Sequence, residues 1–288
     1  MKKQTIAIVG ATGMLGSHVT RILASQGFNI IVAARNMDKA AEMFQNTEIE
    51  IRKADLKKPD TLRDAFRGAD LLYLNLSTAP SERGQHFKTE IDGLGNAINA
   101  AIDTNIGRIG YLSSLVKDYS DTTWWVFDVK RKSVQLLLNS ALPATIFYPS
   151  NFYENLTELQ MKGNRIMLAG DQITKSWWIG TEDYGKQVAA AFRQQHNENR
   201  EYPIQGPEPY NFEEAAKEFI RHYKPASLKI SKAPMWLFRL IKPFSKEVDF
   251  QYNILNAINH YEETFISEKT WKELGRPQQT LKMFAESF

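Results

Sequence analysis

Short apolar runs alternate with longer stretches of helical periodicity in the first half of the chain. The runs have the length and composition of buried strands, and the stretches between them are long enough for helices. Strands are predicted at Ile6–Val9, Asn29–Ala33, Ile49–Lys53, Leu71–Leu76, Arg108–Leu112 and Ala144–Tyr148, and helices at Leu15–Gln26, Asp38–Phe44, Thr61–Phe66, His86–Asp103 and Thr123–Asn139. Short strands joined by helices form right-handed βαβ units, so the pattern predicts an α/β fold with a doubly wound parallel sheet.

The rhythm changes after Pro149, where the segments become more polar and more aromatic. A helix is predicted at Glu182–Gln194, a strand at Tyr202–Gln205 and a further helix at Phe212–Tyr223. We therefore expect residues 1–150 to form the doubly wound domain and residues 151–288 to form a smaller C-terminal α+β subdomain that binds substrate. The boundary is soft, because some segments of the second part are expected to return to the core of the first.

One apolar segment, Pro234–Phe244, has the sequence PMWLFRLIKPF. It is far shorter than a membrane-spanning helix and is interrupted by Arg239 and Lys242, so we expect a helix that packs under or over a cleft. Elsewhere no window approaches about 18 uninterrupted apolar residues, and no membrane span is expected. The apolar run behind the basic N-terminus is too short for a signal peptide, which predicts a cytoplasmic protein.

Composition narrows the function classes without choosing among them. The 288 residues are 43% hydrophobic and 24% charged, as in an ordinary globular protein. A net charge of +3 with scattered basic residues does not favour nucleic acid as a partner. The chain has no Cys, and its five His residues are not at ligand spacing, so no metal site is expected. Whether the protein is a monomer or a homodimer is left open.

A glycine-rich turn directly follows the first predicted strand and opens the first predicted helix. Its sequence is Gly10-Ala11-Thr12-Gly13-Met14-Leu15-Gly16. In a Rossmann sheet the first glycine allows a tight turn, the second lets the backbone approach a pyrophosphate, and the third lets helix and strand pack closely. The helix N-terminus adds unpaired N–H groups and a positive dipole. This turn predicts a dinucleotide site.

The end of the second predicted strand favours NADP(H) over NAD(H). An NAD site places a carboxylate there to hold the ribose 2′-hydroxyl, whereas this chain has Arg35, which can contact a 2′-phosphate. The alternative is an exposed Arg35 at the start of a solvated helix. Asp55, after the third strand, can accept a hydrogen bond from an adenine amine or can cap the next turn.

Lys130 lies on the apolar face of the helix predicted at Thr123–Asn139. It shares that face with Phe127, Val134, Leu137, Leu138 and Ala141, at helical spacing. Burying an ammonium is costly, and the helix follows the fifth strand, where it would lie beside the nicotinamide ribose. We therefore expect Lys130 to bind the ribose and polarise an acceptor. The alternative is a lysine whose stem packs while its head reaches solvent.

Several motifs together resemble the NmrA-like branch of atypical short-chain dehydrogenases, over roughly residues 4 to 195. The branch includes quinone reductases, a triphenylmethane reductase, benzylic ether reductases and redox-sensing regulators. The motifs are the glycine turn, Arg35, Phe127-Asp128-x-Lys130, Ala141-Leu142-Pro143-x-Thr145, Asn151-Phe152-x-x-Asn155 and Trp177–Asp183. Position 141 departs from the glycine that the family usually has there.

The resemblance implies roles for a set of residues near the strand ends. Lys130 matches a lysine that is catalytic in the benzylic ether reductases. The tyrosine that short-chain dehydrogenases place four residues earlier is replaced by Val126. Ser113 and Ser114 lie where such enzymes hold a hydrogen-bonding serine, although serine is also common at strand ends. Asn75 and Ser77 are expected to line the nicotinamide side, and Tyr148, Asn151, Phe152 and Tyr153, with the Trp pairs 124/125 and 177/178, are expected to form a pocket for a flat substrate or to belong to the core.

These observations leave three hypotheses for function. The first is an NADPH-dependent reductase of a quinone-like or conjugated aromatic small molecule, a reaction that tolerates the missing tyrosine. The second is a non-catalytic NADP(H)-binding redox sensor that acts through protein contacts. The third, an enzyme like the sugar-nucleotide epimerases, is disfavoured because carbonyl–hydroxyl cycling needs a proton shuttle.

Overall fold

A seven-stranded sheet forms the centre of the structure, a computed structural model that describes residues 3–120 and 123–288. The strand order is β10-β6-β5-β4-β1-β2-β3, and all neighbouring strands are parallel. The strands are β1 (Thr5–Val9), β2 (Asn29–Ala34), β3 (Glu50–Lys53), β4 (Leu71–Leu74), β5 (Arg108–Leu112), β6 (Ala144–Pro149) and β10 (Arg200–Ile204). The predicted doubly wound α/β fold is confirmed. Its order reverses between β1 and β4, where a ligand crevice is expected.

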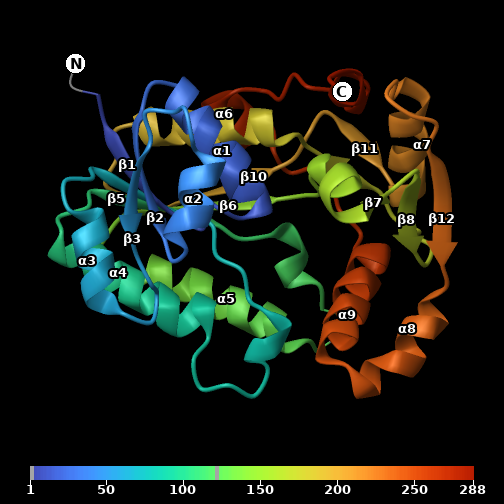
Figure 1. The fold of residues 1–288 in the computed structure, drawn as a ribbon, viewed down its shortest axis with the longest axis horizontal. Helices are drawn as coiled ribbons and strands as arrows, with labels where there is room; N and C mark the ends of the chain where they lie inside the picture. The colour runs from blue at the N-terminus through green and yellow to red at the C-terminus, as the bar shows by residue number, and fades with distance from the viewer. Residues whose placement is uncertain (1–2, 121–122) are drawn as a thin grey trace.

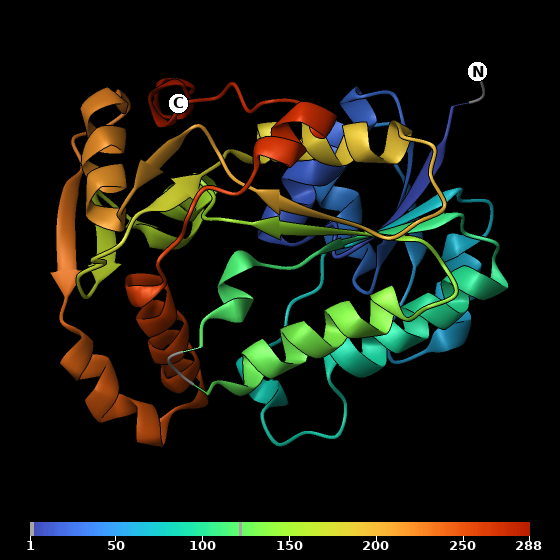
Figure 2. The same cartoon turned by 180° about the vertical axis from the view of Figure 1, so that it is seen from behind.

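Helices cover both faces of this sheet (Figures 1 and 2). On one face lie α1 (Met14–Ser25), α2 (Met37–Met43) and α6 (Thr181–Arg193), and on the other α3 (Pro59–Phe66), α4 (Leu94–Asp103) and α5 (Trp125–Leu138). Strand β1 contributes side chains to both layers, because Ile6 and Ile8 belong to one apolar cluster while Ala7 and Val9 belong to the other. Burial on both sides explains why these strands are continuously apolar in sequence.

The fourth predicted helix begins later than expected. It was predicted from His86, but the chain first makes a single wide helical turn at η2 (Thr89–Gly93) before α4 begins. The start is fixed by side chains: the Asp92 carboxylate accepts from the Lys88 N–H at 2.7 Å, and Glu82 accepts from the Thr89 N–H at 2.9 Å. These capping bonds end the extended approach at Lys88, and the wide turn places Glu90 fully inside the protein.

The C-terminal half builds a smaller unit beside the sheet and also returns to it. Strand β10 pairs with β6, and α6 packs on α1, so both belong to the main layers. The smaller unit contains the three-stranded sheet β12-β8-β7 and the two-stranded sheet β11-β9. Its elements are η4 (Asn155–Gln160), β7 (Met161–Lys162), β8 (Arg165–Ala169), β9 (Ser176–Trp178), β11 (Glu208–Tyr210), α7 (Phe212–His222), β12 (Lys229–Ala233) and α11 (Leu281–Glu286).

An arm of three helical segments links the smaller unit to the mouth of the sheet. It consists of α8 (Met235–Ile241), η5 (Lys242–Phe244) and α9 (Lys246–His260), and α10 (Glu268–Leu274) follows further along the chain. In α8, Phe238 lines a cavity of about 570 Å³, but much of the helix faces outward. Within the described residues, no helix is both long and apolar enough to cross a membrane. The short connections η1 (Pro80–Glu82) and η3 (Leu115–Asp118) complete the elements.

Candidate functional site

The glycine turn at the end of β1 has the geometry that its sequence predicts. Gly10 has φ +84°, and a Cβ there would stand 2.0 Å from the carbonyl oxygen of Asn75, which follows β4. A Cβ on Gly16 would stand 2.1 Å from the Gly10 carbonyl oxygen. Gly13 is exposed, and a Cβ there would meet only that same oxygen, at 3.3 Å. Two glycines are therefore needed for packing, whereas Gly13 leaves room for a ligand.

The first turn of α1 borders the space that Gly13 leaves for a ligand. No side chain caps the helix at Gly13, so the N–H groups of Met14 and Leu15 have no partner within the helix. Thr12 and Leu15 are partly exposed beside them. A cradle of backbone donors at a helix N-terminus fits a pyrophosphate.

Three cationic side chains surround the next corner of the site. Arg35 is exposed just after β2, and Lys53 Nζ donates to its carbonyl oxygen at 2.6 Å. Lys39 Nζ donates to the Thr12 carbonyl oxygen at 3.0 Å, which joins the start of α2 to the glycine turn. Asp55, by contrast, accepts from the Lys57 N–H at 2.9 Å and so caps its own turn. This corner is suited to a phosphate group rather than to a ribose 2′-hydroxyl alone.

A cleft begins at the carboxyl ends of β4, β5 and β6. It consists of two adjoining cavities of about 220 and 180 Å³, which share Ser114, Val116 and Ile254 in their walls. The larger cavity is lined by Leu15 of the glycine turn together with Ser113, Asn151 and Phe152. The smaller is lined by Ser77, Thr78, Glu90, Phe127 and Lys130. The glycine turn and the predicted acceptor groups therefore line adjoining cavities.

Lys130 is held in the smaller cavity by a carboxylate that the sequence reasoning missed. Its Nζ lies 2.8 Å from Oε2 of Glu90, whose side chain is fully buried. The Tyr111 hydroxyl donates to the same oxygen at 2.5 Å, and the Thr78 hydroxyl donates to Oε1 at 2.9 Å. Ser133 donates to the backbone carbonyl of Glu90 at 2.5 Å. The charge of the inward-facing Lys130 ammonium is thus balanced by the Glu90 carboxylate, which also accepts hydrogen bonds from Tyr111 and Thr78.

This polar cluster (Thr78, Glu90, Tyr111 and Lys130) contains a tyrosine from β5, whereas α5 has none four residues before Lys130. Burial, with the neighbouring Glu90 adding to it, raises the pKa of Tyr111 well above the ordinary phenol value, so Tyr111 stays a donor. Val126 is buried where a short-chain dehydrogenase would have its tyrosine. A helical signal could have revealed Glu90, since it lies on the same apolar stripe as Leu94, Ala97 and Ile98.

The larger cavity combines apolar walls with several polar side chains, of which Ser113 and Glu263 are the most distinctive. Ser113 is 4% exposed, and its hydroxyl has no hydrogen-bond partner within the described structure. Glu263, which sequence reasoning also missed, accepts from the Ser150 hydroxyl at 2.8 Å, the Trp177 N–H at 3.1 Å and the Gln205 amide at 2.7 Å. Burial nevertheless raises the pKa of Glu263 above the ordinary value. The cavity can therefore present a hydroxyl and a carboxyl to a bound molecule.

The structure does not bring every predicted substrate residue to this cleft. Asn151 and Phe152 line it. Tyr148 lies in the core beneath α5, and its hydroxyl donates a hydrogen bond to Glu201. Tyr153 is fully buried in the smaller unit, where it donates to the Gln279 carbonyl at 3.4 Å. Neither Tyr148 nor Tyr153 lines either cavity of the cleft. Trp178 is buried in the core of the smaller unit, whereas Trp124 lines the cleft.

Helix α9 covers the cleft from the C-terminal arm. Phe250 and Ile254 line the smaller cavity, and Ile254 and Ile258 line the larger one. The ring centroids of Phe250 and Trp124 are 4.9 Å apart, in an edge-to-face arrangement. This contact joins the arm to the start of α5, so a distant segment completes the apolar wall.

A single family model matches residues 2–280 of this chain. The glycine turn, the cationic corner and the cleft all lie within that range. The chain belongs to the NmrA-like family. The resemblance seen in its sequence motifs is confirmed, and the match extends well beyond residue 195.

Relatives of this NmrA-like chain include both an assembly factor and a reductase. A photosystem II assembly factor from Trieres chinensis is 23% identical over 282 residues, which cover 93% of this chain and 87% of that protein. An NAD(P)H azoreductase from Xenophilus azovorans is 24% identical over 215 residues, covering 73% and 71%. At identities of 23% and 24%, neither relative shows the activity of this chain, which depends on the residues of its own site.

Solved structures show the same fold over nearly the whole chain. An NADPH-dependent quinone oxidoreductase from Escherichia coli, in complex with NADPH, has a TM-score of 0.70 and 22% identity, with 98% of this chain and 99% of that one covered. A Citrobacter triphenylmethane reductase in complex with NADP(H) has a TM-score of 0.72 and 18% identity, with 99% and 100% covered. These NADP(H)-binding neighbours share the sheet and the smaller mixed unit seen here.

Proposed function

We propose that this chain is an NADPH-dependent reductase of quinone-like or conjugated aromatic small molecules. The observation that carries the proposal is that the cavity lined by Leu15 of the glycine turn adjoins the cavity lined by Lys130, with Ser114 in the wall of both. A cofactor held by the glycine turn would then lie next to an acceptor in this cleft. The neighbours that bind NADPH and the azoreductase relative support the same class of reaction.

The residues present fit NADPH. The turn from Gly10 to Gly16 would hold the pyrophosphate, Arg35 and Lys39 the 2′-phosphate, and Asn75, Ser77 and Lys130 the nicotinamide side. Gly10 and Gly16 let the turn pack closely, since a Cβ at either would stand 2.0 or 2.1 Å from a backbone oxygen, and Gly13 leaves the space beside the turn open. When bound, NADPH supplies hydride.

The chain's own residues then prepare the acceptor. Glu90 fixes the Lys130 ammonium at the cavity wall, where it faces a developing negative charge on an acceptor oxygen or nitrogen. The Ser113 hydroxyl is buried and has no partner among residues 3–120 and 123–288, so it is available to donate to the same acceptor. Ile254, Ile258 and Phe250 of α9 exclude water from the cleft. A conjugated acceptor suits this arrangement because its charge is delocalised and needs no phenolic proton donor.

The test is NADPH oxidation by the purified protein with a panel of quinones, azo dyes and enones. Lys130→Met should lower kcat by about a hundredfold, the usual effect of removing one group that stabilises developing charge. Lys132→Met is the matched control, because Lys132 is exposed on the same helix. Arg35→Gln should raise KM for NADPH by about tenfold or more and leave KM for NADH nearly unchanged. Full activity of Lys130→Met would contradict the proposed role of the lysine.

A second candidate function is favoured by one observation. Relatives that cover most of this chain are described as photosystem II assembly factors, and the missing tyrosine is compatible with a non-catalytic NADP(H)-binding regulator. NADPH binding, measured by its fluorescence in the presence of protein, separates the two candidates. Tight binding without turnover of any acceptor on the panel would favour the regulator, and saturable turnover would favour the reductase.

A further inference from the structure

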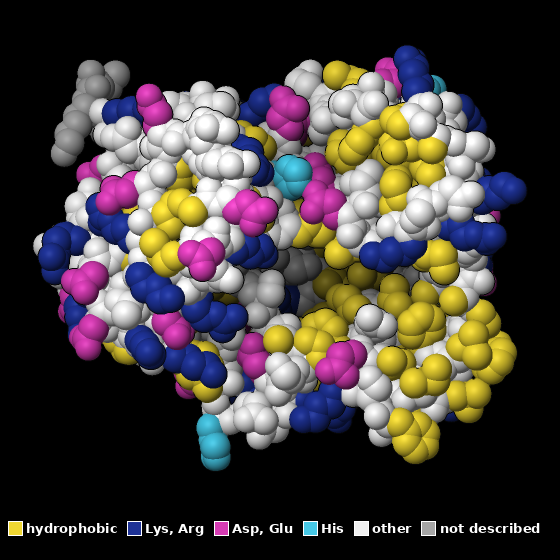
Figure 3. Space-filling model, in the orientation of Figure 1, with side chains coloured by type: hydrophobic (Ala, Val, Ile, Leu, Met, Phe, Trp, Pro, Cys, Tyr) yellow, Lys and Arg dark blue, Asp and Glu magenta, His cyan; other side chains and the backbone are white. Residues whose placement is uncertain are grey.

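The C-terminal arm carries an unusual concentration of exposed apolar side chains. Of the thirteen large hydrophobic side chains that are exposed in the described residues, five lie within nine positions of α8 and η5. We name these five the arm patch: Trp236, Leu237, Leu240, Ile241 and Phe244, which are 59%, 38%, 63%, 50% and 89% exposed. Figure 3 shows hydrophobic side chains gathered on this side of the molecule, over the α8 region of Figure 1. Patches of this kind mark an interaction surface.

The opposite side of α8 is already used for packing. Met235 lies against Gly170, whose Cβ, if present, would stand 2.5 Å from the Met235 Cγ. Phe238 lines the 570 Å³ cavity between α8, α9 and the smaller unit. The helix is therefore held in place by its inner side, and the arm patch has no role in the fold that would explain its exposure.

Charges around the arm patch are all of one sign along its own segment. From Met235 to Lys246 the chain has Arg239, Lys242 and Lys246 and no acidic residue. Lys242 lies over the ring of Tyr252, with its Nζ 4.0 Å from the centroid, and Lys246 reaches the Arg83 carbonyl oxygen at 3.5 Å. Acidic residues resume at Glu247 and Asp249, and the latter is paired with Arg83 at 2.6 Å. Exposed aromatic and aliphatic side chains with a cationic rim are typical of helices that lie in a membrane interface.

We propose that the arm patch docks on the surface of an anionic lipid bilayer. The helix α8 has only seven residues and cannot span a bilayer, so it would lie in the interface plane with Phe244 and Trp236 inserted. Arg239 and Lys246 would meet anionic headgroups. A second copy of the chain is a poorer occupant, because a two-fold contact would bring the three cations of one patch against those of the other. This proposal does not depend on the proposed function.

Vesicle flotation with the full chain tests the proposal. The probes are vesicles of phosphatidylcholine alone and vesicles with equal parts of phosphatidylcholine and phosphatidylglycerol. The protein is expected to float with the anionic vesicles, and the double variant Leu240→Asp/Phe244→Asp is expected to stay behind. Arg239→Gln/Lys246→Gln should weaken binding by about fivefold for each removed cation. Ile173→Asp is the matched control, since Ile173 is 74% exposed but lies outside the arm patch.

Each outcome supports or overturns the bilayer as occupant. Flotation that is lost in the arm variants and kept in Ile173→Asp supports it, provided that circular dichroism and thermal unfolding show folded variants. Absence of flotation with anionic vesicles overturns it, as does equal loss in Ile173→Asp. A concentration-dependent dimer that dissociates in Leu240→Asp/Phe244→Asp, measured by light scattering without lipid, would assign the patch to a second copy instead.

Discussion

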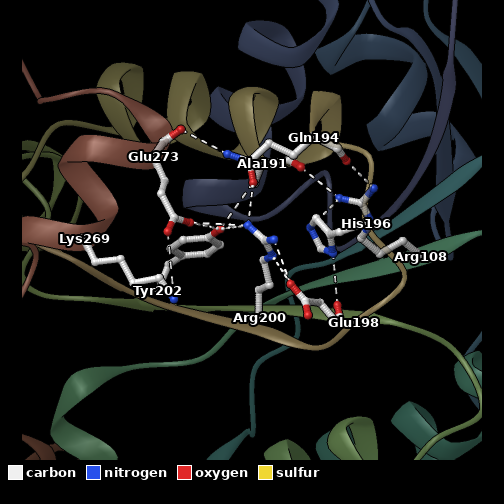
Figure 4. Close-up of polar contacts among 9 residues, drawn as sticks. All are labelled: Arg108, Ala191, Gln194, His196, Glu198, Arg200, Tyr202, Lys269 and Glu273. Atoms are coloured by element: carbon white, nitrogen blue, oxygen red, sulfur yellow. Dashed lines mark hydrogen bonds and ion pairs between the residues drawn. The ribbon is translucent and has the colours of Figure 1, made fainter.

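Two buried charge clusters lie at opposite ends of β5, and only one of them borders a cleft. At the amino end, Arg108 donates to the carbonyl oxygens of Ala191 and Gln194 at 2.8 and 2.6 Å, and its Nη1 lies 3.0 Å from His196 (Figure 4). At the carboxyl end, Tyr111 donates to Glu90, which pairs with Lys130 beside the cleft. The same strand thus begins and ends at a charge buried in the protein.

The amino-end cluster joins α6, β10 and α10. Its donors are directed at the last carbonyl groups of α6, and Arg200 and Tyr202 bind Glu273 of α10 next to it, as Figure 4 shows. Burial, with the charge of Arg200 adding to it, lowers the pKa of Arg108 from its ordinary value. None of its residues lines the cleft at the other end of the sheet. A buried charge with a shifted pKa therefore does not identify a site unless it also faces a cavity.

The largest effect is expected from removing the amino-end charge. Arg108→Met takes away donors to two carbonyl groups at the end of α6 and should lower the free energy of unfolding by about 2–4 kcal/mol. KM for NADPH should stay unchanged, because the cofactor site lies at the opposite end of the sheet. Urea denaturation and steady-state kinetics measure the two quantities. The exposed Arg193, which binds the Gln26 carbonyl, is the control, and Arg193→Met should cost less than about 1 kcal/mol. A large change in KM for Arg108→Met would contradict the division between the two ends.

A somewhat smaller loss of stability, together with a loss of activity, is expected at the carboxyl end. Glu90→Gln keeps an acceptor for Tyr111 and Thr78 but leaves the Lys130 ammonium, whose side chain is 17% exposed, without its counter-charge. We expect the free energy of unfolding to fall by about 2 kcal/mol. Activity should fall as in Lys130→Met, because the ammonium is no longer held at the cavity wall.

A double-mutant cycle sharpens this point. If Glu90 acts by positioning Lys130, Glu90→Gln/Lys130→Met should lose no more activity than Lys130→Met alone, and the coupling free energy in stability should be about 0.5–3 kcal/mol. Additive losses of activity would show instead that Glu90 acts on the reaction by another route.

The two ends of the cleft also differ in how far the sequence reveals them. The glycine turn could be predicted because its requirement is local: only glycine fits a φ of +84° with the Asn75 carbonyl so close. Lys130 could be predicted because helical periodicity places it on a buried stripe. Its partner Glu90 lies forty positions earlier. Helical spacing to Leu94, Ala97 and Ile98 marks Glu90 as inward-facing, but nothing local in the sequence shows that it pairs with Lys130. The strands of the seven-stranded sheet and the fold class depend on local patterns and were predicted for the same reason as the turn.

Residues in the C-terminal half lacked even that local signal. Glu263 follows the end of α9 at His260 and belongs to no helix or strand, so no period marks it as inward-facing. Tyr148 and Tyr153 were expected in the cleft because aromatic residues cluster after β6. Instead, Tyr148 in β6 joins the core cluster beneath α5, and Tyr153, in the turn after β6, is buried in the smaller unit. Aromatic composition indicates burial but does not say in which core.

The smallest effect is expected at Glu263, where the sign of a pH dependence provides the test. Because burial raises the pKa of this carboxyl group, the folded protein binds the proton more tightly than the unfolded chain. Its contribution therefore makes the fold more stable as the pH falls from neutral through the raised pKa, and less stable above it. Glu263→Gln keeps an oxygen for the Trp177 N–H and removes the charge. The variant should gain melting temperature relative to the wild type at pH 8, and the gain should shrink at pH 5.

Glu154 provides the matched control for this last comparison. Burial raises its pKa as well, and its carboxylate accepts from the Thr181 N–H at 3.0 Å, but it lies outside the cleft. Glu154→Gln should show the same sign of pH-dependent stabilisation while leaving KM for quinones unchanged, whereas Glu263→Gln should change both. If Glu263→Gln lost stability at pH 8, the three hydrogen bonds to the charged carboxylate would outweigh the cost of its burial. Glu263 would then be an anion that holds Ser150, Trp177 and Gln205 in place, and the larger cavity would present a fixed negative charge to its ligand.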